Sequence, residues 1–368
     1  MTRLLSQKFR FLTFACIFLL AYVHGYNLHN TYLQPHSTVH EPITVTTFFE
    51  YLLANGLLRF RIPLLFLISG YLYAHYDDQP YGQRTRKRFA TLLVPYLLWS
   101  ALALLLTFAL QQHPHSAAIV KAAAVDQLGD NRPYTEIGWS GMLYRWLLAP
   151  PAYQLWFIFV LFVYNLLYPF IRWVLLRAAW FWLPVCFVLW FTYFNIGLIE
   201  GQGLFFFSMG AFIRLRHYSI EKPPRWYSEG LAWIFFLGVC FIKTFMAFEL
   251  APNSPATWYT LAILYNLAIL AGIMAVWFSS SRLAAWCMQR PLFKQLSGYS
   301  FFMYGMHIPL LAYVATWLRQ VAGHFSYFRL SAYLLLPAVL MLLCVGTAML
   351  LRRYLPRLYG WLAGGRGL

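Results

Sequence analysis

The stretch Phe11-Leu-Thr-Phe-Ala-Cys-Ile-Phe-Leu-Leu-Ala-Tyr-Val23 decides the fold class, because this apolar run ends abruptly at His24. With its flanks it supplies about 20 mostly apolar residues, the length that an α-helix needs to cross a hydrocarbon core roughly 30 Å thick. The residues that follow, His-Gly-Tyr-Asn, contain no small-residue cleavage site of the kind that ends a signal peptide. The stretch therefore predicts a retained membrane span.

The composition of the whole chain agrees with this first run. Of the 368 residues, 61% are hydrophobic and 11% are charged, whereas soluble proteins have roughly 45–50% apolar and about 25% charged residues. The formal net charge is +17, which on a soluble protein would indicate nucleic-acid binding. Here the basic residues lie in short clusters between long apolar runs. The composition excludes a soluble single-core domain and predicts a lipid bilayer, not nucleic acid, as the partner.

Further apolar runs predict an all-α fold, a polytopic membrane helix bundle of about ten transmembrane helices in one domain over residues 1–368. Two long extracytoplasmic loops, 28–57 and 111–153, connect them, and Val45–Gly56 is predicted as an interfacial helix. The predicted spans are 9–27, 58–75, 89–110, 154–171, 180–198, 201–215, 230–249, 257–279, 297–318 and 329–351.

The basic residues orient these spans. With the N-terminus in the cytoplasm, 20 of the 28 Lys and Arg residues fall in predicted cytoplasmic segments, as the positive-inside rule requires. Most acidic residues fall on the other side. Both termini are therefore predicted to be cytoplasmic, and most of the net charge is an orientation signal.

The first span carries two ionisable residues, which within membranes are costly and often functional. Arg10 precedes His24 by fourteen residues, which places the two within about 40° of the same helix face and about 21 Å apart along the axis. Arg10 thus marks the cytoplasmic end of a face whose outer end carries His24. The alternatives are an interfacial histidine without chemistry and a topological arginine.

Two arginines begin the second span on its outer side, against the charge rule. Arg59 and Arg61 each need a partner or water there, and Glu41 or Glu50 could pair with one of them. The alternative is a pair of interfacial arginines whose head groups reach water.

The ninth span carries Tyr304 and His307 three residues apart, hence on one face, with Pro309 close by. A histidine this deep in an apolar helix needs a polar partner, and a packed, hydrogen-bonded histidine is the alternative to a functional one. The five cysteines show no metal-ligand spacing, and the histidines of the long loops are interpreted as solvated, so no metal is predicted.

Seven short motifs follow one another along most of the chain. Together, in this order and with this hydropathy, they resemble the acyltransferase-3 family of integral membrane acyltransferases. The motifs are Arg10 to His24, Arg59-x-x-x-Pro63, Phe66–Leu72, Lys87–Trp99, Leu155-Trp-Phe-Ile158, Phe205–Gly210 and Tyr299 to Pro309.

The resemblance implies transfer of an acyl group, often acetyl, from a cytoplasmic donor such as acetyl-CoA. It implies a glycan or lipid-linked sugar as acceptor, and a bacterial inner membrane as location. The family's first-span histidine corresponds to His24. Its arginine would stand at Thr13, so Arg10 could serve from one turn lower. The family's Arg-Asp after Trp-Phe is replaced by Phe159 and Val160.

The residues support a mechanism in which His24 is the general base, because an unperturbed imidazole titrates near 6.5 and can take a hydroxyl proton. An acyl-histidine intermediate is the variant. Arg59 or Tyr304 would hold the thioester oxygen or the acceptor, and His307 completes the predicted catalytic set. The polyanionic CoA head is predicted to bind Arg10, Arg84, Arg86, Lys87 and Arg88, and the acceptor to bind Arg61, Glu41 and Asn27.

A secondary transporter or glycan flippase, with intramembrane histidines as a proton relay, is the alternative function. Such transporters tend to show broken helices and repeat symmetry, which the sequence does not show. Dependence on an ion gradient without consumption of acyl-CoA would favour this alternative.

Overall fold

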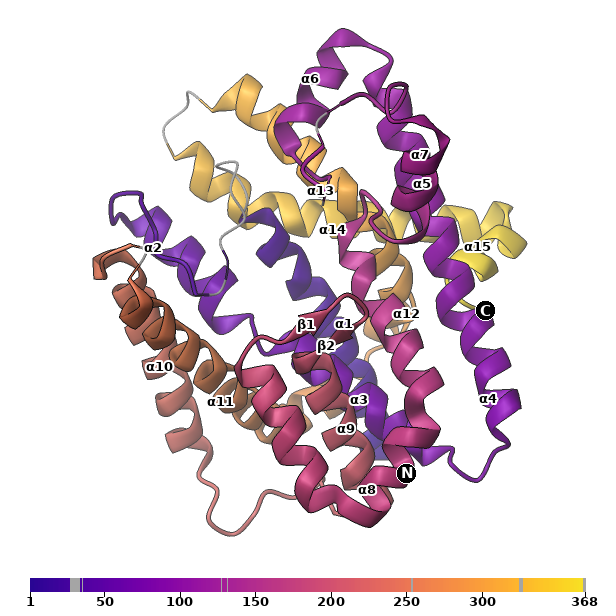
Figure 1. The fold of residues 1–368 in the computed structure, drawn as a ribbon, viewed down its shortest axis with the longest axis vertical. Coiled ribbons are helices and arrows are strands. Elements are labelled where there is room, and N and C mark those ends of the chain that lie inside the picture. Colours follow the sequence, from indigo (N-terminus) through magenta and orange to yellow (C-terminus); the bar gives the residue numbers. More distant parts are fainter. Residues whose placement is uncertain are drawn as a thin grey trace. The chain divides into compact units, whose positions relative to one another are not determined.

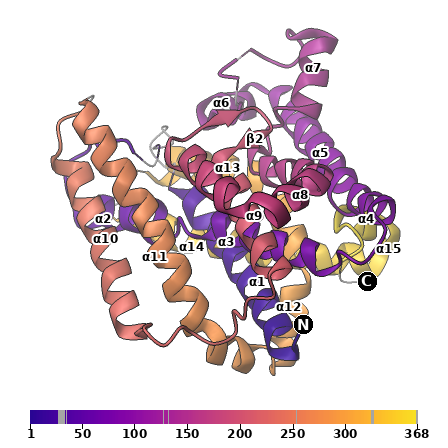
Figure 2. The same cartoon turned by 60° about the horizontal axis from the view of Figure 1, so that its bottom comes forward.

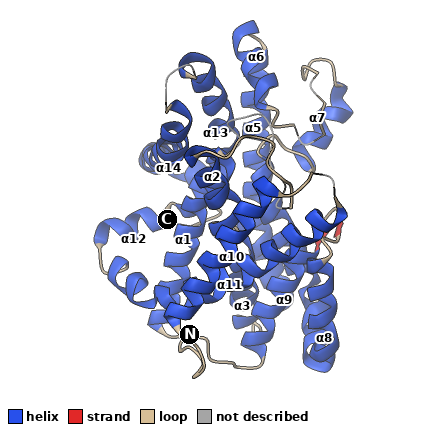
Figure 3. Ribbon diagram, turned by 90° about the vertical axis from the view of Figure 1, so that its left-hand side faces the viewer, coloured by secondary structure: helices blue, strands red, loops and turns tan. Residues whose placement is uncertain are grey.

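The computed structural model describes residues 1–26, 34, 36–126, 128–130, 132–252, 254–323 and 327–366. Helices form nearly all of the regular structure, and the described strands pair in one short antiparallel hairpin, drawn in red in Figure 3. Eight helical segments in the described residues are long and apolar enough to cross a membrane. The predicted all-α, polytopic membrane fold is confirmed.

The elements follow the chain as labelled in Figure 1. They are α1 (Arg3–Gly25), α2 (Val45–Tyr51), the π-helical η2 (Leu52–Leu57), α3 (Arg61–His75), α4 (Tyr81–Arg88), the π-helical η3 (Phe89–Leu93), α5 (Val94–Gln111), α6 (Pro114–Ala123), α7 (Gly138–Leu147), the 3-10 turn η4 (Tyr153–Leu155), α8 (Trp156–Phe191), β1 (Asn195–Ile196), β2 (Ile199–Glu200), α9 (Gly201–Leu215), α10 (Glu229–Glu249), α11 (Pro255–Cys287), α12 (Pro291–Gly298), α13 (Ser300–Ala322), α14 (Phe328–Tyr354) and α15 (Pro356–Leu362).

The difference between about ten predicted spans and eight has two local causes. The predicted spans 154–171 and 180–198 fall largely within the helical segment α8, which counts once among the eight, although the non-helical backbone of Ala178 (φ −139°, ψ 41°) divides it into two helices. The predicted span 201–215 is helical as α9, but its 15 residues are too few to cross a bilayer alone.

The described residues group into two compact units. Unit 1 contains Met1–Cys16, Leu33–Arg86 and Val160–Ser297, and unit 2 contains Ile17–Tyr32, Lys87–Phe159 and Gly298–Leu368. Helix α1 therefore contributes its first part to unit 1 and its end, with His24, to unit 2.

Glycines hold unit 1 together where α3 packs on α9. A Cβ on Gly70 would overlap the carbonyl of Phe207, and a Cβ on Gly210 would overlap the carbonyl of Leu67. The absence of side chains at both positions lets the two backbones touch, as small residues do between membrane helices. Beside them α10 and α11 pack along each other, as Figure 2 shows.

Unit 2 is built around α5, α13 and α14, with α15 packed against α5 and α14. The predicted loop 111–153 contains α6 and α7. Arg145, buried at 2% exposure, ties this segment together by ion pairs to Asp126 at 2.7 Å and Asp130 at 3.2 Å. The hydrogen bond from Arg132 lowers the pKa of Asp130, so this carboxylate is charged at neutral pH.

Candidate functional site

Two imidazoles meet in unit 2, one at the end of α1 and one in the middle of α13. The ring centroids of His24 and His307 are 5.5 Å apart. His307 is fully buried and His24 is half-buried. Residues 283 positions apart in the sequence thus form one site, and both were predicted to be catalytic.

The partners of the two rings differ in kind. Nδ1 of His307 lies 3.1 Å from the carbonyl oxygen of Met303 and 3.0 Å from that of Tyr304. Carbonyl oxygens only accept, so this Nδ1 carries the proton and the lone pair of the neutral ring is on Nε2. Nδ1 of His24 lies 3.1 Å from the hydroxyl of Tyr153, which can either donate or accept. The proton of His307 is fixed, whereas that of His24 can move.

The segment that holds His307 is a bend in α13. Pro309 has no N–H, so it cannot bond the carbonyl of Gly305 one turn earlier, and Ile308 leaves helical geometry (φ −111°, ψ 138°). The side-chain amide of Gln154 replaces the missing donor. Its Nε2 donates to the carbonyls of Tyr304 and Gly305, both at 3.2 Å, and to that of Ile308 at 3.3 Å.

A second hydrogen bond runs back from α13 to η4, since the buried hydroxyl of Tyr304 donates to the backbone carbonyl of Gln154. This bond makes Tyr304 a positioning residue for the bend in α13. The Oε1 atom of Gln154 is a buried acceptor that has no donor among the described residues.

Of the predicted acceptor-binding and second-span residues, Arg59, Arg61 and Glu41 lie in unit 1. The guanidinium of Arg59 lies over the ring of Tyr265 at 5.9 Å, and Arg61, buried at 2% exposure, donates to the carbonyl of Leu58. Glu41 is half-buried in the segment before α2. Asn27 lies outside the described residues.

Lys243 lies near Arg59 and was missed by the sequence analysis. Its ammonium is fully buried, donates to the hydroxyl of Tyr51 at 3.2 Å and to the carbonyl of Asn55 at 3.1 Å, and lies 5.8 Å from the centre of the Tyr265 ring. Among the described residues it forms no ion pair. The available signal was a single Lys inside the run 230–249, since such a charge in a span is costly.

The cations predicted to bind CoA fall into three groups. Arg10 is exposed and tied to the α12 segment, donating to the hydroxyl of Ser297 at 2.8 Å and to the carbonyl of Lys294 at 2.5 Å. Arg84 is buried and its guanidinium is engaged by Asp77 and by the carbonyl of Tyr73.

The third group of predicted CoA-binding cations follows Arg84 on α4. Arg86 and Lys87 are exposed and Arg88 is half-exposed. The structure thus leaves these three as the accessible cations of this helix. Within the described ranges, no three His, Cys, Asp or Glu side chains gather as metal ligands.

Tyr153 and Gln154 were also missed, although they immediately precede the motif Leu155–Ile158. A polar pair at the start of a long apolar run was the available signal. Its meaning depends on the fold, which brings η4 against α13.

Comparison with known proteins identifies the family of the chain. The family model described as "Acyltransferase domain" (Acyl_transf_3) matches residues 14–353. The succinoglycan biosynthesis protein ExoH of Rhizobium meliloti (strain 1021) is 26% identical over 321 residues, covering 85% of this chain and 81% of that protein. No solved structure matches. The match over nearly the whole chain confirms the resemblance seen in the motifs: the protein belongs to the acyltransferase-3 family of integral membrane acyltransferases.

Proposed function

We propose that the protein is an O-acyltransferase that moves an acyl group, acetyl in the first instance, from cytoplasmic acetyl-CoA to a hydroxyl of an exopolysaccharide or a lipid-linked oligosaccharide. The observation that carries the proposal is the pair of imidazoles held at the bend of α13 by uncharged partners. The name of the relative, a succinoglycan biosynthesis protein, supports an exopolysaccharide as the acceptor. The proposed location is a bacterial inner membrane.

In the proposed reaction His24 takes the proton of the acceptor hydroxyl as its oxygen attacks the thioester carbonyl. The new C–O bond forms, the C–S bond breaks, and His24 returns the proton to the departing thiolate, which leaves as CoA-SH. Such proton transfer contributes typically 10²–10⁴-fold to a rate. In this mechanism Nδ1–H of His24 donates to the Tyr153 hydroxyl, 3.1 Å away, so that the basic lone pair is on Nε2.

His307 and Gln154 act on this base through packing and geometry. The fixed Nδ1–H of His307 keeps its ring in one orientation against His24. Gln154 holds the bend and offers its Oε1 atom to the substrate. Arg86, Lys87 and Arg88 are the proposed contacts of the CoA phosphates, because arginine and lysine recognise phosphate by charge and hydrogen bonds, and Arg10 is the further candidate.

The test uses the full-length protein in lipid nanodiscs with acetyl-CoA labelled in the acetyl group and a membrane glycan extract. We expect label to pass to glycan with the wild-type protein and to fall at least about a hundredfold with His24→Ala. His115→Ala, at an exposed histidine of α6, is the matched control and should retain transfer.

Three results separate this function from its alternatives. Transfer from a longer acyl-CoA but not from acetyl-CoA would replace the acetyl assignment. Full transfer by folded His24→Ala would remove His24 from the mechanism. No transfer from any acyl-CoA, with glycan movement that depends on an ion gradient, would establish a transporter in place of an acyltransferase.

A further inference from the structure

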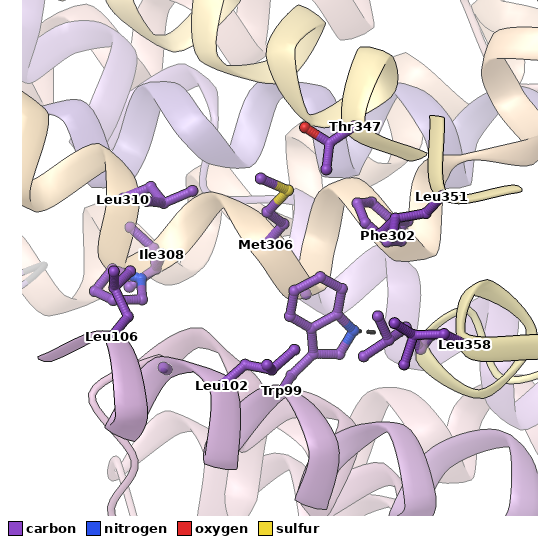
Figure 4. Close-up of a pocket in the computed structure, with 14 residues that line it drawn as sticks. Trp99, Leu102, Leu106, Phe302, Met306, Ile308, Leu310, Thr347, Leu351 and Leu358 are labelled. Atoms are coloured by element: carbon purple, nitrogen blue, oxygen red, sulfur yellow. Dashed lines mark hydrogen bonds between the residues drawn. The ribbon is translucent and has the colours of Figure 1, made fainter. Parts of the chain in front are cut away.

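A second feature of unit 2 is a cavity of about 340 Å³ between α5, α13, α14 and α15, drawn in Figure 4. The side chains of Trp99, Leu102 and Leu106 on α5 face Met306 on α13 across it. Its size lies in the range of pockets that hold small organic ligands. The cavity is therefore large enough for part of a lipid-sized molecule.

The cavity lies on the face of α13 away from His307. The lining positions before the bend, Phe302, Gly305 and Met306, follow helical spacing, and at about 100° per residue His307 is turned by roughly 145° from their mean direction. A molecule in the cavity contacts the residues on both sides of His307 without lying beside the base. The cavity is thus distinct from the proposed reaction site.

The side chains that line the cavity are almost all apolar, so they favour a hydrocarbon chain as the ligand. Thr347 contributes the one hydroxyl among the lining side chains, and its Oγ1 already donates to the carbonyl of Leu343 at 2.9 Å. The indole N–H of Trp99 is likewise satisfied, donating to the carbonyl of Leu362 at 3.0 Å. Water needs two to four polar partners to occupy a cavity stably, and the lining side chains supply only the oxygen of the Thr347 hydroxyl as a remaining acceptor. An apolar chain would instead gain dispersion contacts along its length.

The cavity is reachable from the bilayer, because two of the leucines that line it are exposed on the surface of the protein, one on α5 and one on α15. Leu102 on α5 is 44% exposed and Leu358 on α15 is 37% exposed. The positive-inside assignment puts the α14–α15 junction at the cytoplasmic side. A chain entering here therefore comes from the cytoplasmic leaflet.

Positive charge surrounds the same end. Arg352 and Arg353 follow the lining residue Leu351, and Arg357 precedes the lining residue Leu358. All three arginines are exposed. Basic clusters beside membrane helices attract anionic lipid head groups. The site thus combines a hydrocarbon slot with cations where a phosphate would lie.

We propose that this cavity binds one chain of an anionic glycerophospholipid of the cytoplasmic leaflet, whose phosphate contacts Arg352, Arg353 and Arg357. A structural lipid fits better than the lipid-linked acceptor, because an acceptor must present its hydroxyl to His24 whereas this cavity is on the opposite face of α13. The bound chain supports the bend of α13 from behind, against Gly305 and Met306.

The test measures retained lipid by native mass spectrometry on full-length, delipidated protein, with phosphatidylglycerol or phosphatidylcholine of identical chains added. We expect one phosphatidylglycerol to be retained at least about tenfold more tightly than phosphatidylcholine. Ala103→Phe fills the cavity from its α5 wall and should abolish retention of both lipids. Ala109→Phe, at an exposed α5 position outside the lining, should leave both unchanged.

A second set of variants tests the cations. The triple variant Arg352→Gln, Arg353→Gln, Arg357→Gln should lower retention of phosphatidylglycerol to that of phosphatidylcholine. The triple variant Arg225→Gln, Arg282→Gln, Arg290→Gln removes equal charge elsewhere and should not. Leu106→Trp replaces Ala103→Phe if the latter fails to fold, as judged by gel filtration and melting temperature.

Three outcomes would overturn the proposal: retention that survives both filling variants, equal loss in the two arginine triples, or tighter retention of a polyprenyl phosphate than of phosphatidylglycerol. None of these readouts depends on acyl transfer. A failure of the proposed enzymatic function therefore leaves this test intact, and the reverse also holds.

Discussion

The two clusters of ionisable groups differ in what their side chains can do with a proton. In unit 2, His24 and His307 contact a phenol and two carbonyls. In unit 1, Lys243 and Arg59 contact the ring of Tyr265, and Lys243 bonds neutral oxygens. Imidazole is the side chain whose ordinary pKa lies near neutral pH. The first cluster therefore suits proton transfer, whereas the second contains no imidazole.

The largest difference between the two clusters is expected when one ionisable group is removed from each. We expect His24→Gln to lower kcat by about 10²–10⁴-fold, because it removes the base. Lys243→Met should keep kcat within about threefold, because a lysine that is not at the reacting atoms contributes no transition-state interaction. Steady-state transfer in nanodiscs, with melting temperatures as the check on folding, measures both. A loss in folded Lys243→Met equal to that in His24→Gln would contradict the division of roles.

The bend of α13 is the next element to test. Gln154→Leu removes the donor to three carbonyls, which displaces His307, and a misplacement of about 1 Å can cost about 10²-fold in rate. We expect kcat to fall about 10- to 100-fold. Gln112→Leu is the matched control, because Gln112 is exposed and donates only to the carbonyl of Phe108. Unchanged kcat in Gln154→Leu would show that the bend needs no side-chain donor.

Two tyrosines near the proposed base differ in role: Tyr153 contacts the base directly, and Tyr304 positions the segment around it. Tyr153 contacts His24, whereas Tyr304 donates to the backbone of Gln154. We expect Tyr153→Phe to lower kcat about tenfold and to move the pH–rate profile by more than about half a unit, since it changes a hydrogen bond to the titrating ring.

Tyr304→Phe should lower kcat by only a few fold and leave the profile in place. The two variants are compared by kcat measured between pH 5 and pH 9. A shifted profile in Tyr304→Phe, or none in Tyr153→Phe, would reverse these assignments.

The sequence predicted the fold class and both histidines of the imidazole site, but not Tyr153 and Gln154, for one physical reason. Apolar runs of membrane length and a histidine at the end of such a run are local patterns, so they can be seen without the fold. The contacts of Tyr153 with His24 and of Gln154 with α13 are not local, because η4 lies far from both helices in the sequence. They depend on the bend at Ile308 and on which carbonyl Pro309 leaves without an N–H donor.

The sequence was less informative about helix number and about Lys243. The segment α8 counts once among the eight although the break at Ala178 divides it into two helices, and the apolar run 201–215 was predicted to span although α9 has only 15 residues. Lys243 was a visible charge in a span, but its partners Tyr51 and Asn55 lie about 190 residues earlier and only packing of α10 on η2 joins them. Arg84 was predicted at the CoA site from charge alone, which cannot reveal its ion pair with Asp77.

The cost of burying Lys243 gives a smaller prediction. Replacing a buried charge by an apolar residue of similar shape is often neutral or stabilising. We expect Lys243→Met to stabilise the protein by about 1 kcal/mol, seen as a higher melting temperature. Lys243→Ala instead leaves a cavity and should destabilise by about 2 kcal/mol or more. A melting temperature that Met lowers as much as Ala would show that the ammonium itself holds α10 to η2.

The smallest effect links Lys243 to His36, which lies outside the spans against Tyr193 and Trp258. Burial, and secondly the charge of Lys243, lowers the pKa of His36 below 6.5. The folded protein then binds this proton less readily than the unfolded chain, so stability falls as the pH drops from about 6.5 to the pKa of folded His36. Lys243→Met removes the second cause and should shrink the fall in melting temperature between pH 7.5 and pH 5, and His36→Gln should remove this contribution. If Lys243→Met shows the full wild-type fall while His36→Gln does not, Lys243 does not act on His36, and burial alone lowers the pKa of His36.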